Sequence, residues 1–262
     1  MTDQFVTHGG LAFRCRLDGT EGQPWMVFSN SLVTDLTVWD HQVAAFASRY
    51  RILRYDQRGH GGTSVPPAPA TIAQLADDAA ALMSHFGARD AVFIGVSMGA
   101  ATGFALAQKR PDLVARLVAS DGQAANAQGG AASWQDRITL AERDGMTGYA
   151  DVTMDRWFSA RSRAEANPAM PPIRRMIEAT PLQGMIACAR ALQSYDFRPG
   201  LPAMRQPSLL MAGAEDGVMP ASMQALLPHL ADARYVEIAD AGHIPAIERP
   251  AAFNAAIEDF LT

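Results

Sequence analysis

The sequence has few cysteines, no long apolar run and no basic cluster. Only two of its 262 residues are cysteines, Cys15 and Cys188, and their wide separation offers neither a disulfide framework nor a zinc-like spacing. We expect two buried thiols. No apolar stretch approaches a membrane span, and residues 1–10 lack the charged and apolar parts of a secretory signal. We therefore expect a cytoplasmic protein without a membrane partner.

The charge balance also excludes an obvious nucleic-acid partner. Lys and Arg number 22 against 27 Asp and Glu, a formal net charge of −5. The chain is long enough for one α/β core with an insertion and too short for two complete enzyme domains. We expect one globular unit, and the sequence leaves open whether it forms a homo-oligomer.

Strand-like apolar runs alternate with amphipathic helical segments over most of the chain. After a hairpin turn at Gly9 and Gly10, the predicted strands are 10–17, 25–29, 50–55, 91–95, 113–120, 208–212 and 235–239. The predicted helices are 37–49, a helix capped by Thr71 and ended at Gly87, 98–109, 221–230 and 250–261. Alternation of this kind predicts a mostly parallel sheet with helices on both faces.

The alternation is absent between residues 123 and 205. Gln, Gly, Arg, Met and Pro mix there with short helical patterns, and no strand is predicted. We interpret 123–205 as a helical cap inserted into a core formed by residues 1–122 and 206–262.

The pattern Gly-x-Ser-x-Gly occupies residues 95–99, between a predicted strand and a predicted helix. A serine on so sharp a turn sits in strained backbone, and the glycines leave room for neighbouring backbone. This context predicts that Ser97 is a nucleophile raised above the sheet.

A serine hydroxyl needs a base, and the base needs an orienting acid. Of six histidines, only His243 follows a late strand in a short loop preceded by glycine. Asp216 follows the predicted strand 208–212, which gives the order Ser, Asp, His that suits this topology. The rival acids are Glu215, which we expect to point away, and Asp121, which could reach the same histidine.

The reaction also needs hydrogen-bond donors where negative charge develops on the attacked carbonyl oxygen. We expect these donors to be the backbone N–H groups of Met98 and of Leu32, which lies in the loop after an early strand. The alternative interpretation of that loop is an ordinary polar turn.

With these residues in place, the chain resembles the α/β-hydrolase superfamily over nearly its whole length, and within it the 3-oxoadipate enol-lactonases. The stretches that carry the resemblance are Ser29-Asn-Ser-Leu32, Thr34-Asp35, Trp39-Asp40, Leu53-Arg-Tyr-Asp-Gln-Arg-Gly-His-Gly61, Gly95-Val-Ser-Met-Gly99, Trp134, Arg137 and Arg156-Trp-Phe158. Most of the superfamily has His-Gly where this chain has Asn30-Ser31. The resemblance implies an eight-stranded, mostly parallel sheet and a serine mechanism without metal or cofactor.

The resemblance also implies a reaction of aromatic-compound catabolism, in which Ser97 opens an enol-lactone to an acyl-enzyme that water then hydrolyses. The substrate would carry a carboxylate, which needs a cationic or strongly hydrogen-bonding partner. We expect the substrate to be contacted by Ser31, Trp134 and Arg137. An exposed helix face is the alternative for Arg137, and Arg174 and Arg175 are weaker candidates for the same role.

Other features have architectural interpretations. Arg58 and His60 belong to a loop that the family resemblance assigns to structure, and we expect Arg58 to brace its turn. The cap methionines could line an apolar pocket, although methionine is more often a gap filler. Val33 stands where the resembled family usually has glycine, one of several departures in regions that would read the substrate.

Two further function classes stay open. A carboxylesterase, another lactonase or a carbon-carbon bond hydrolase would use the same three residues with a different pocket. A small-molecule binding protein could keep the fold without turnover. Haloalkane dehalogenases and epoxide hydrolases are disfavoured because they need a carboxylate nucleophile, whereas the turn holds serine.

Overall fold

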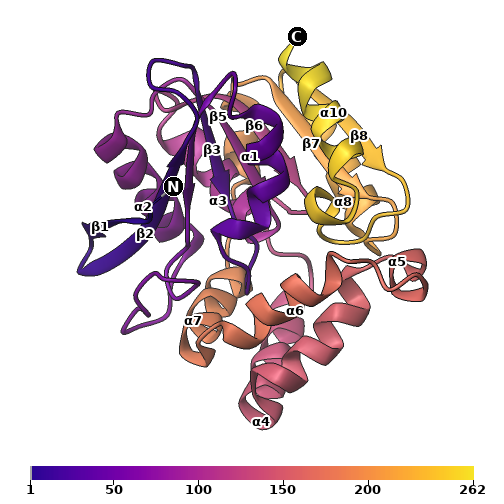
Figure 1. Ribbon diagram of the computed structural model, residues 1–262. Helices are drawn as coiled ribbons and strands as arrows, with labels where there is room; N and C mark the ends of the chain where they lie inside the picture. Colours follow the sequence, from indigo (N-terminus) through magenta and orange to yellow (C-terminus); the bar gives the residue numbers. More distant parts are fainter. Residues whose placement is uncertain (1) are drawn as a thin grey trace.

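A computed structural model describes residues 2–262, which form one eight-stranded sheet with helices on both faces (Figure 1). The strands are β1 (Gln4–His8), β2 (Leu11–Asp18), β3 (Trp25–Ser29), β4 (Arg51–Tyr55), β5 (Ala91–Val96), β6 (Val114–Ser120), β7 (Ser208–Gly213) and β8 (Ala233–Ile238). Their order is β1-β2-β4-β3-β5-β6-β7-β8, antiparallel from β1 through β2 to β4 and parallel elsewhere. The predicted fold class is confirmed.

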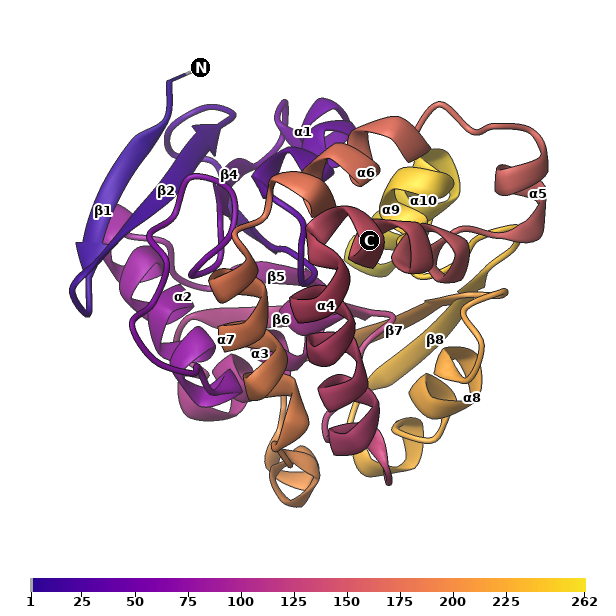
Figure 2. The same ribbon diagram turned by 90° about the horizontal axis from the view of Figure 1, so that it is seen from below.

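The core helices lie in two layers, one on each side of the sheet. Figure 2 shows α1, α9 and α10 on one side and α2, α3 and α8 on the other. Their bounds are α1 (Asp40–Phe46) with the 3-10 turn η1 (Leu36–Trp39) before it, α2 (Ile72–Phe86), α3 (Met98–Lys109), α8 (Met219–Gln224), η3 (Leu227–His229), α9 (Pro245–Glu248) and α10 (Pro250–Leu261). Because both faces are covered, β5 and β7 are buried at every position, as their continuous apolar runs predict.

Local signals explain why α2 begins and ends where predicted. Thr71 and Gln74 form a reciprocal capping box, which satisfies two N–H groups at the helix start. Gly87 ends the helix in the left-handed region, with φ of 73°.

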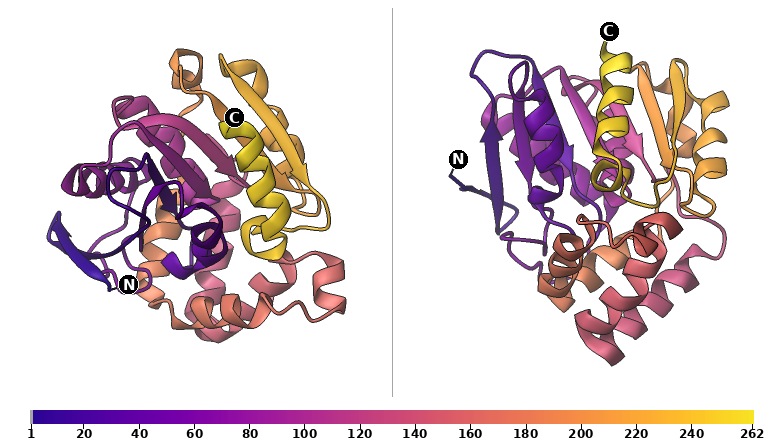
Figure 3. Two further views of the ribbon diagram at one scale, coloured as in Figure 1. Left: turned by 45° about the horizontal axis from the view of Figure 1, so that its top comes forward. Right: turned by 45° about the vertical axis from the view of Figure 1, so that its right-hand side comes forward.

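Four helices and a 3-10 segment lie between β6 and β7, within the range 123–205 that we call the cap. They are α4 (Gly130–Trp157), α5 (Ala160–Ala164), α6 (Met170–Ala179), α7 (Leu182–Gln193) and η2 (Arg198–Ala203). Figures 1 and 3 show the four helices gathered at one end of the sheet. The long α4 changes direction at Gly145, whose φ of 68° is not helical. The domain boundaries themselves stay a prediction.

The two ends of the cap leave and rejoin the core side by side. Asn126 N donates to Tyr195 O at 2.9 Å, and Phe197 N donates to Ala124 O at 2.8 Å. An isolated antiparallel bridge joins Ala125 to Asp196 between these two bonds. Helices α4 to α7 are therefore connected to the core through two adjacent backbone segments.

Two predicted helices are wrong in extent. The segment 221–230 is divided into α8 and η3, because Pro228 lacks the N–H that a continuing helix needs and its ring clashes with the preceding turn. The segment 37–49 is a 3-10 turn followed by the short α1. Cys15 and Cys188 are buried free thiols, as predicted. Among residues 2–262, no helix combines the length and the apolar character needed to cross a bilayer.

Candidate active site

Ser97 lies on a sharp turn between β5 and α3, with φ of 56° and ψ of −112°. Only glycine fits two residues before it and two residues after it. A Cβ on Gly99 would lie 2.0 Å from Ser29 O, and one on Gly95 would lie 2.2 Å from Gly99 O. The close approach of these backbone segments holds Ser97 in a conformation that residues other than glycine rarely adopt.

The structure brings Ser97, Asp216 and His243 together at the carboxyl ends of β5, β7 and β8. His243 Nε2 lies 2.9 Å from Ser97 Oγ, and His243 Nδ1 lies 2.7 Å from Asp216 Oδ2. The backbone N–H of His243 donates to Trp157 O at 2.8 Å, which anchors the histidine loop to the end of α4. This arrangement can deprotonate a serine hydroxyl and orient the base that does so.

The two rival acids have different surroundings. Glu215 Oε2 accepts a hydrogen bond from Ala160 N of the cap at 2.8 Å. Asp121 is buried beside Asp216 and accepts hydrogen bonds from other groups. Asp121, Asp216 and His243 also place one ligand-type atom each within 4.8 Å of one another. Both ring nitrogens of His243 are already hydrogen-bonded, an arrangement that suits a catalytic triad better than a metal site.

A cavity of about 610 Å³ lies between this end of the sheet and the cap. Its lining contains Ser97 and His243 together with the predicted contact residues Ser31, Trp134 and Arg137. Polar and charged side chains thus share one cavity with the candidate nucleophile Ser97, as in a small-molecule site.

Of the two residues predicted to hold the oxyanion, Met98 directly follows Ser97 in the chain and Leu32 shares the cavity with it. Leu32 lines the cavity, and Met98 is the first residue of α3, so its N–H has no acceptor within the helix. Gln57, to which the sequence assigned no role, supports the loop after β3 that contains Leu32, because its Nε2 donates to Asn30 O at 2.8 Å. Asn30 in turn donates to Tyr55 O at 3.1 Å.

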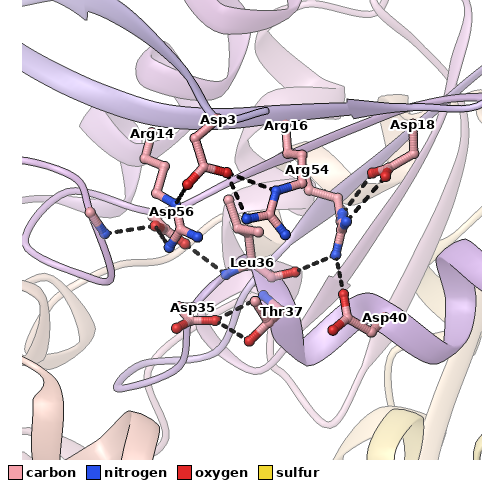
Figure 4. Close-up of polar contacts among 11 residues, drawn as sticks. Asp3, Arg14, Arg16, Asp18, Asp35, Leu36, Thr37, Asp40, Arg54 and Asp56 are labelled. Carbon is pink, nitrogen blue, oxygen red and sulfur yellow. Dashed lines mark hydrogen bonds and ion pairs between the residues drawn. The ribbon is translucent and has the colours of Figure 1, made fainter. Parts of the chain in front are cut away.

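A buried ion-pair network holds the far end of the same loop (Figure 4). Arg54 is 1% exposed and donates to both oxygens of Asp18, to Asp40 Oδ1 and to Leu36 O. Asp56 Oδ1 accepts from Leu36 N at 2.6 Å. No sequence motif identified this network, because its members become neighbours only when β2, β4 and η1 pack together.

Val33 has a conformation that suits the glycine it replaces. Its φ is 58° although its side chain is fully buried, a backbone region that β-branched residues rarely adopt. The loop that contains Leu32 is therefore held in strained backbone at the next residue.

Arg137 does not stand free on an exposed helix face. Its guanidinium lies 4.3 Å from the ring centroid of Trp134. Burial lowers the pKa of Arg137 to about 10, and the positive charge of Arg156 contributes in the same direction. Arg174, by contrast, is paired with Asp151 and Glu178 away from this cavity.

The remaining candidates are structural. Arg58 donates to both oxygens of Asp78 at 2.7 Å, which braces the loop as expected. His60 is fully buried, with Nδ1 at 2.9 Å from Arg58 O. Five cap methionines pack in the interior or against it and do not line the cavity: Met146, Met154, Met170, Met176 and Met185. Their gap-filling interpretation holds.

The chain belongs to the alpha/beta hydrolase fold family, whose profile matches residues 24–250. Within that family it is 35% identical to 3-oxoadipate enol-lactonase 2 of Acinetobacter baylyi, over 97% of this chain and 94% of the relative. It is 31% identical to 3-oxoadipate enol-lactonase 1 of the same organism, over 96% and 94%. The predicted family resemblance is confirmed.

Solved structures agree with this placement. The enol-lactonase from Burkholderia xenovorans superposes with a TM-score of 0.93 at 37% identity, over 98% of this chain and 99% of the other. A thermophilic esterase from Thermogutta terrifontis superposes with a TM-score of 0.90 at 29% identity, over 100% and 98%.

Proposed function

We propose that this chain hydrolyses 3-oxoadipate enol-lactone, or a closely related lactone that carries a carboxylate, through an acyl-enzyme on Ser97. The chain is a carboxylic ester hydrolase, and a lactone is a cyclic ester. The observation that carries the choice of substrate is the cationic Arg137 on the wall of the cavity that contains Ser97 and His243. Similarity to two enol-lactonases of 31% and 35% identity supports it.

In the first step, Ser97 Oγ attacks the lactone carbonyl carbon while His243 Nε2 takes the hydroxyl proton. Asp216, bonded to Nδ1, holds the imidazole in the required tautomer and stabilises the imidazolium. The N–H groups of Leu32 and Met98 donate hydrogen bonds to the carbonyl oxygen, where the negative charge develops. No cofactor takes part.

In the second step, the ring carbon-oxygen bond breaks and His243 returns the proton to the departing enol oxygen. The enol becomes a ketone while the acyl group stays on Ser97. Water, deprotonated by the same histidine, then attacks the acyl carbon and releases the acid. One water is consumed for each lactone opened.

The substrate carboxylate needs a cation that is not already neutralised. Within the described residues 2–262, no Asp or Glu forms an ion pair with Arg137. Its stacking on Trp134 fixes the guanidinium in a partly desolvated position, where a carboxylate is bound more strongly than in water. Ser31 Oγ is buried and has no hydrogen-bond partner among residues 2–262. Because Ser31 lines the cavity, its hydroxyl can bind a substrate oxygen.

The test compares turnover of freshly generated 3-oxoadipate enol-lactone with turnover of p-nitrophenyl acetate, an ester without a carboxylate. Ser97→Ala should lower kcat for both substrates by about 10⁴-fold or more, because the nucleophile is gone. Arg137→Ala should raise KM for the lactone by about 10-fold or more and leave the ester almost unchanged, because one charge-assisted contact is worth roughly 1.5–3 kcal/mol.

Arg174→Ala is the matched control, since this arginine is on the cap but outside the cavity, and it should change neither activity. Ester cleavage without lactone turnover would instead identify a carboxylesterase, a function favoured by the likeness to the Thermogutta esterase. Carbon-carbon bond hydrolysis by the same three residues is tested with the corresponding diketone substrates. Failure of a fluorophosphonate to label Ser97 in folded protein would favour a binding protein.

The cellular setting stays an expectation. We expect the proposed enzyme to act in the cytoplasm on a small molecule, without a membrane or nucleic-acid partner. Sedimentation of the purified chain tests whether it forms a homo-oligomer.

A further inference from the structure

A second carboxyl group lies directly behind the acid of the proposed triad. Asp121 follows β6 and is 1% exposed. One of its oxygens, one oxygen of Asp216 and a ring nitrogen of His243 all lie within 4.8 Å of one another. Its backbone has a φ of 49°, an uncommon conformation that turns Asp121 into this position.

The surroundings of the two carboxyl groups do not allow both to be ionised. Within residues 2–262, no Lys or Arg forms an ion pair with Asp121 or Asp216. The titratable groups that interact with the pair are His243, which is bonded to Asp216, Tyr235 of β8, whose pKa the charge of Asp121 helps to raise, and Arg137 of the cap, on which the charge of Asp216 acts. An oxygen of the buried Asp121 lies within 4.8 Å of an oxygen of Asp216, and the repulsion between two carboxylates this close favours a proton on one of them.

Hydrogen bonding decides which carboxyl group is charged. Asp216 Oδ2 lies 2.7 Å from His243 Nδ1, whose proton stabilises a negative charge there. Asp121 accepts only neutral donors, Gly213 N at 2.8 Å and Ser120 Oγ at 2.5 Å. Burial and the neighbouring charge of Asp216 raise the pKa of Asp121 well above its usual value. The proton therefore belongs on Asp121.

We propose that Asp121 is a positioning residue whose protonated carboxyl donates a hydrogen bond to the Asp216 carboxylate and so fixes the acid that orients His243. The role of Asp121 in turnover rests on the proposed function of the triad, whereas the protonation of its carboxyl group does not depend on any substrate. A protonated Asp121 leaves one negative charge beside the imidazole. A second charge would hold the proton on His243 more tightly and hinder its return to the leaving group.

The proton is tested directly by infrared difference spectroscopy of the substrate-free protein at pH 8. Subtracting the spectrum of Asp121→Asn from that of wild type should show a protonated carboxyl C=O band, because a carboxylic acid absorbs in a region where carboxylates and amides do not. A difference that contains only carboxylate bands would overturn the proposal. Asp240→Asn is the matched control, since Asp240 also has a positive φ of 54° but is an exposed partner of Arg161, and it should remove carboxylate bands alone.

The positioning role is tested by the pH profile of kcat/KM for p-nitrophenyl acetate. The amide of Asp121→Asn can donate to Asp216 as a protonated carboxyl does, so activity should stay within about 3-fold and the acid limb should not move. Asp121→Ala, which has no donor, should lower kcat by about 10-fold or more with little change in KM.

The opposite outcome is equally distinct. If Asp121 were ionised, Asp121→Asn would remove a negative charge near His243 and lower the acid limb by about one to three pH units. That change would overturn the proposal. If the wild type cleaves no ester, the proposed function fails while the infrared measurement still decides the protonation of Asp121.

Discussion

His60 is a histidine that the fold keeps uncharged. Its side chain is fully buried, Nδ1 is bonded to Arg58 O, and Nε2 has no hydrogen-bond partner in the part of the chain that the structure describes. Burial lowers the pKa of His60 to about 4, from an ordinary 6.5. Protonation would leave a charge in the interior without a compensating anion bonded to it.

This histidine predicts a loss of stability in weak acid. The pKa of His60 is lower in the folded chain than in the unfolded chain. The stability that depends on neutral His60 is therefore fully present above pH 6.5 and is lost as the pH falls toward 4. The free energy of unfolding should fall by up to about 3 kcal/mol over that window, since a tenfold change in proton affinity corresponds to about 1.4 kcal/mol. Urea denaturation at a series of pH values measures it.

A second group titrates in the same pH window: burial raises the pKa of Asp56 to about 6, so protonation of Asp56 makes the folded chain more stable as the pH falls. Comparison with His60→Asn is therefore needed to separate the contribution of His60. The variant should lack the fall in unfolding free energy that wild type shows between pH 6.5 and 4. His41→Asn, at an exposed position, should retain it. Parallel curves for wild type and His60→Asn would show that His60 contributes nothing.

At the scale of single residues, the sequence was informative wherever a motif carried the chemistry. The serine turn and the chain order predicted which three residues the structure brings together, Ser97, Asp216 and His243. The sequence put Asp121 within reach of His243 and Val33 at a usual glycine position. The positive φ of Val33 and the approach of Asp121 to within 4.8 Å of Asp216 could not be predicted, because they arise from loops that meet only in three dimensions.

At the scale of elements, α7 packs against the core without room for a single methyl group. A Cβ on Gly184 of α7 would lie 2.0 Å from Gly59 O and 2.8 Å from Gly59 Cα. Both contacts are with backbone, which cannot move aside as a side chain can. Cys188 Sγ also donates to Arg58 O, at 3.4 Å, so one face of α7 rests on the loop that holds His60.

Gly184→Ala should therefore destabilise the protein although alanine is the better helix former. The clash should lower the free energy of unfolding by about 1–3 kcal/mol, which exceeds the gain of roughly 1 kcal/mol in helix propensity. Gln183→Ala, one residue earlier and exposed, should be neutral or slightly stabilising. An alanine at position 184 as stable as wild type would mean that α7 can shift away from the loop.

Element boundaries were predictable where end signals were local. The limits of β3, α3 and α10 match the predicted segments, because turn residues, a proline or a glycine mark their ends. The predicted helix 221–230 was wrong in extent because its apolar spacing continues through Pro228. Helix α9 was not predicted because its four residues are too few to show a helical period.

At the scale of the whole molecule, Glu248 joins the cap to the histidine loop. It is 4% exposed, and its Oε1 accepts from Ser159 N at 2.9 Å and Ser159 Oγ at 2.5 Å. Its Oε2 accepts from Gly242 N at 2.7 Å, one residue before His243. The position of the histidine is thus linked to the position of the cap.

Glu248→Gln should weaken both parts of this link. The amide has one acceptor oxygen instead of two, so at least one buried N–H loses its partner, which costs about 1–3 kcal/mol of unfolding free energy. We expect kcat for p-nitrophenyl acetate to fall by about 10-fold, because a small misplacement of the base is enough to slow proton transfer. Glu258→Gln, on the exposed surface of α10, is the control and should change neither quantity.

The paired ends of the cap at Ala125 and Asp196 bear on how relatives diverge. A segment that leaves and re-enters a scaffold at adjacent points can be lengthened, shortened or exchanged without altering the spacing of the strands on either side. Ser97, Asp216 and His243 all lie outside that segment, whereas Trp134 and Arg137 lie within it. Natural recombination between these two points would therefore exchange Trp134 and Arg137 in a single step, while Ser97, Asp216 and His243 stay in place.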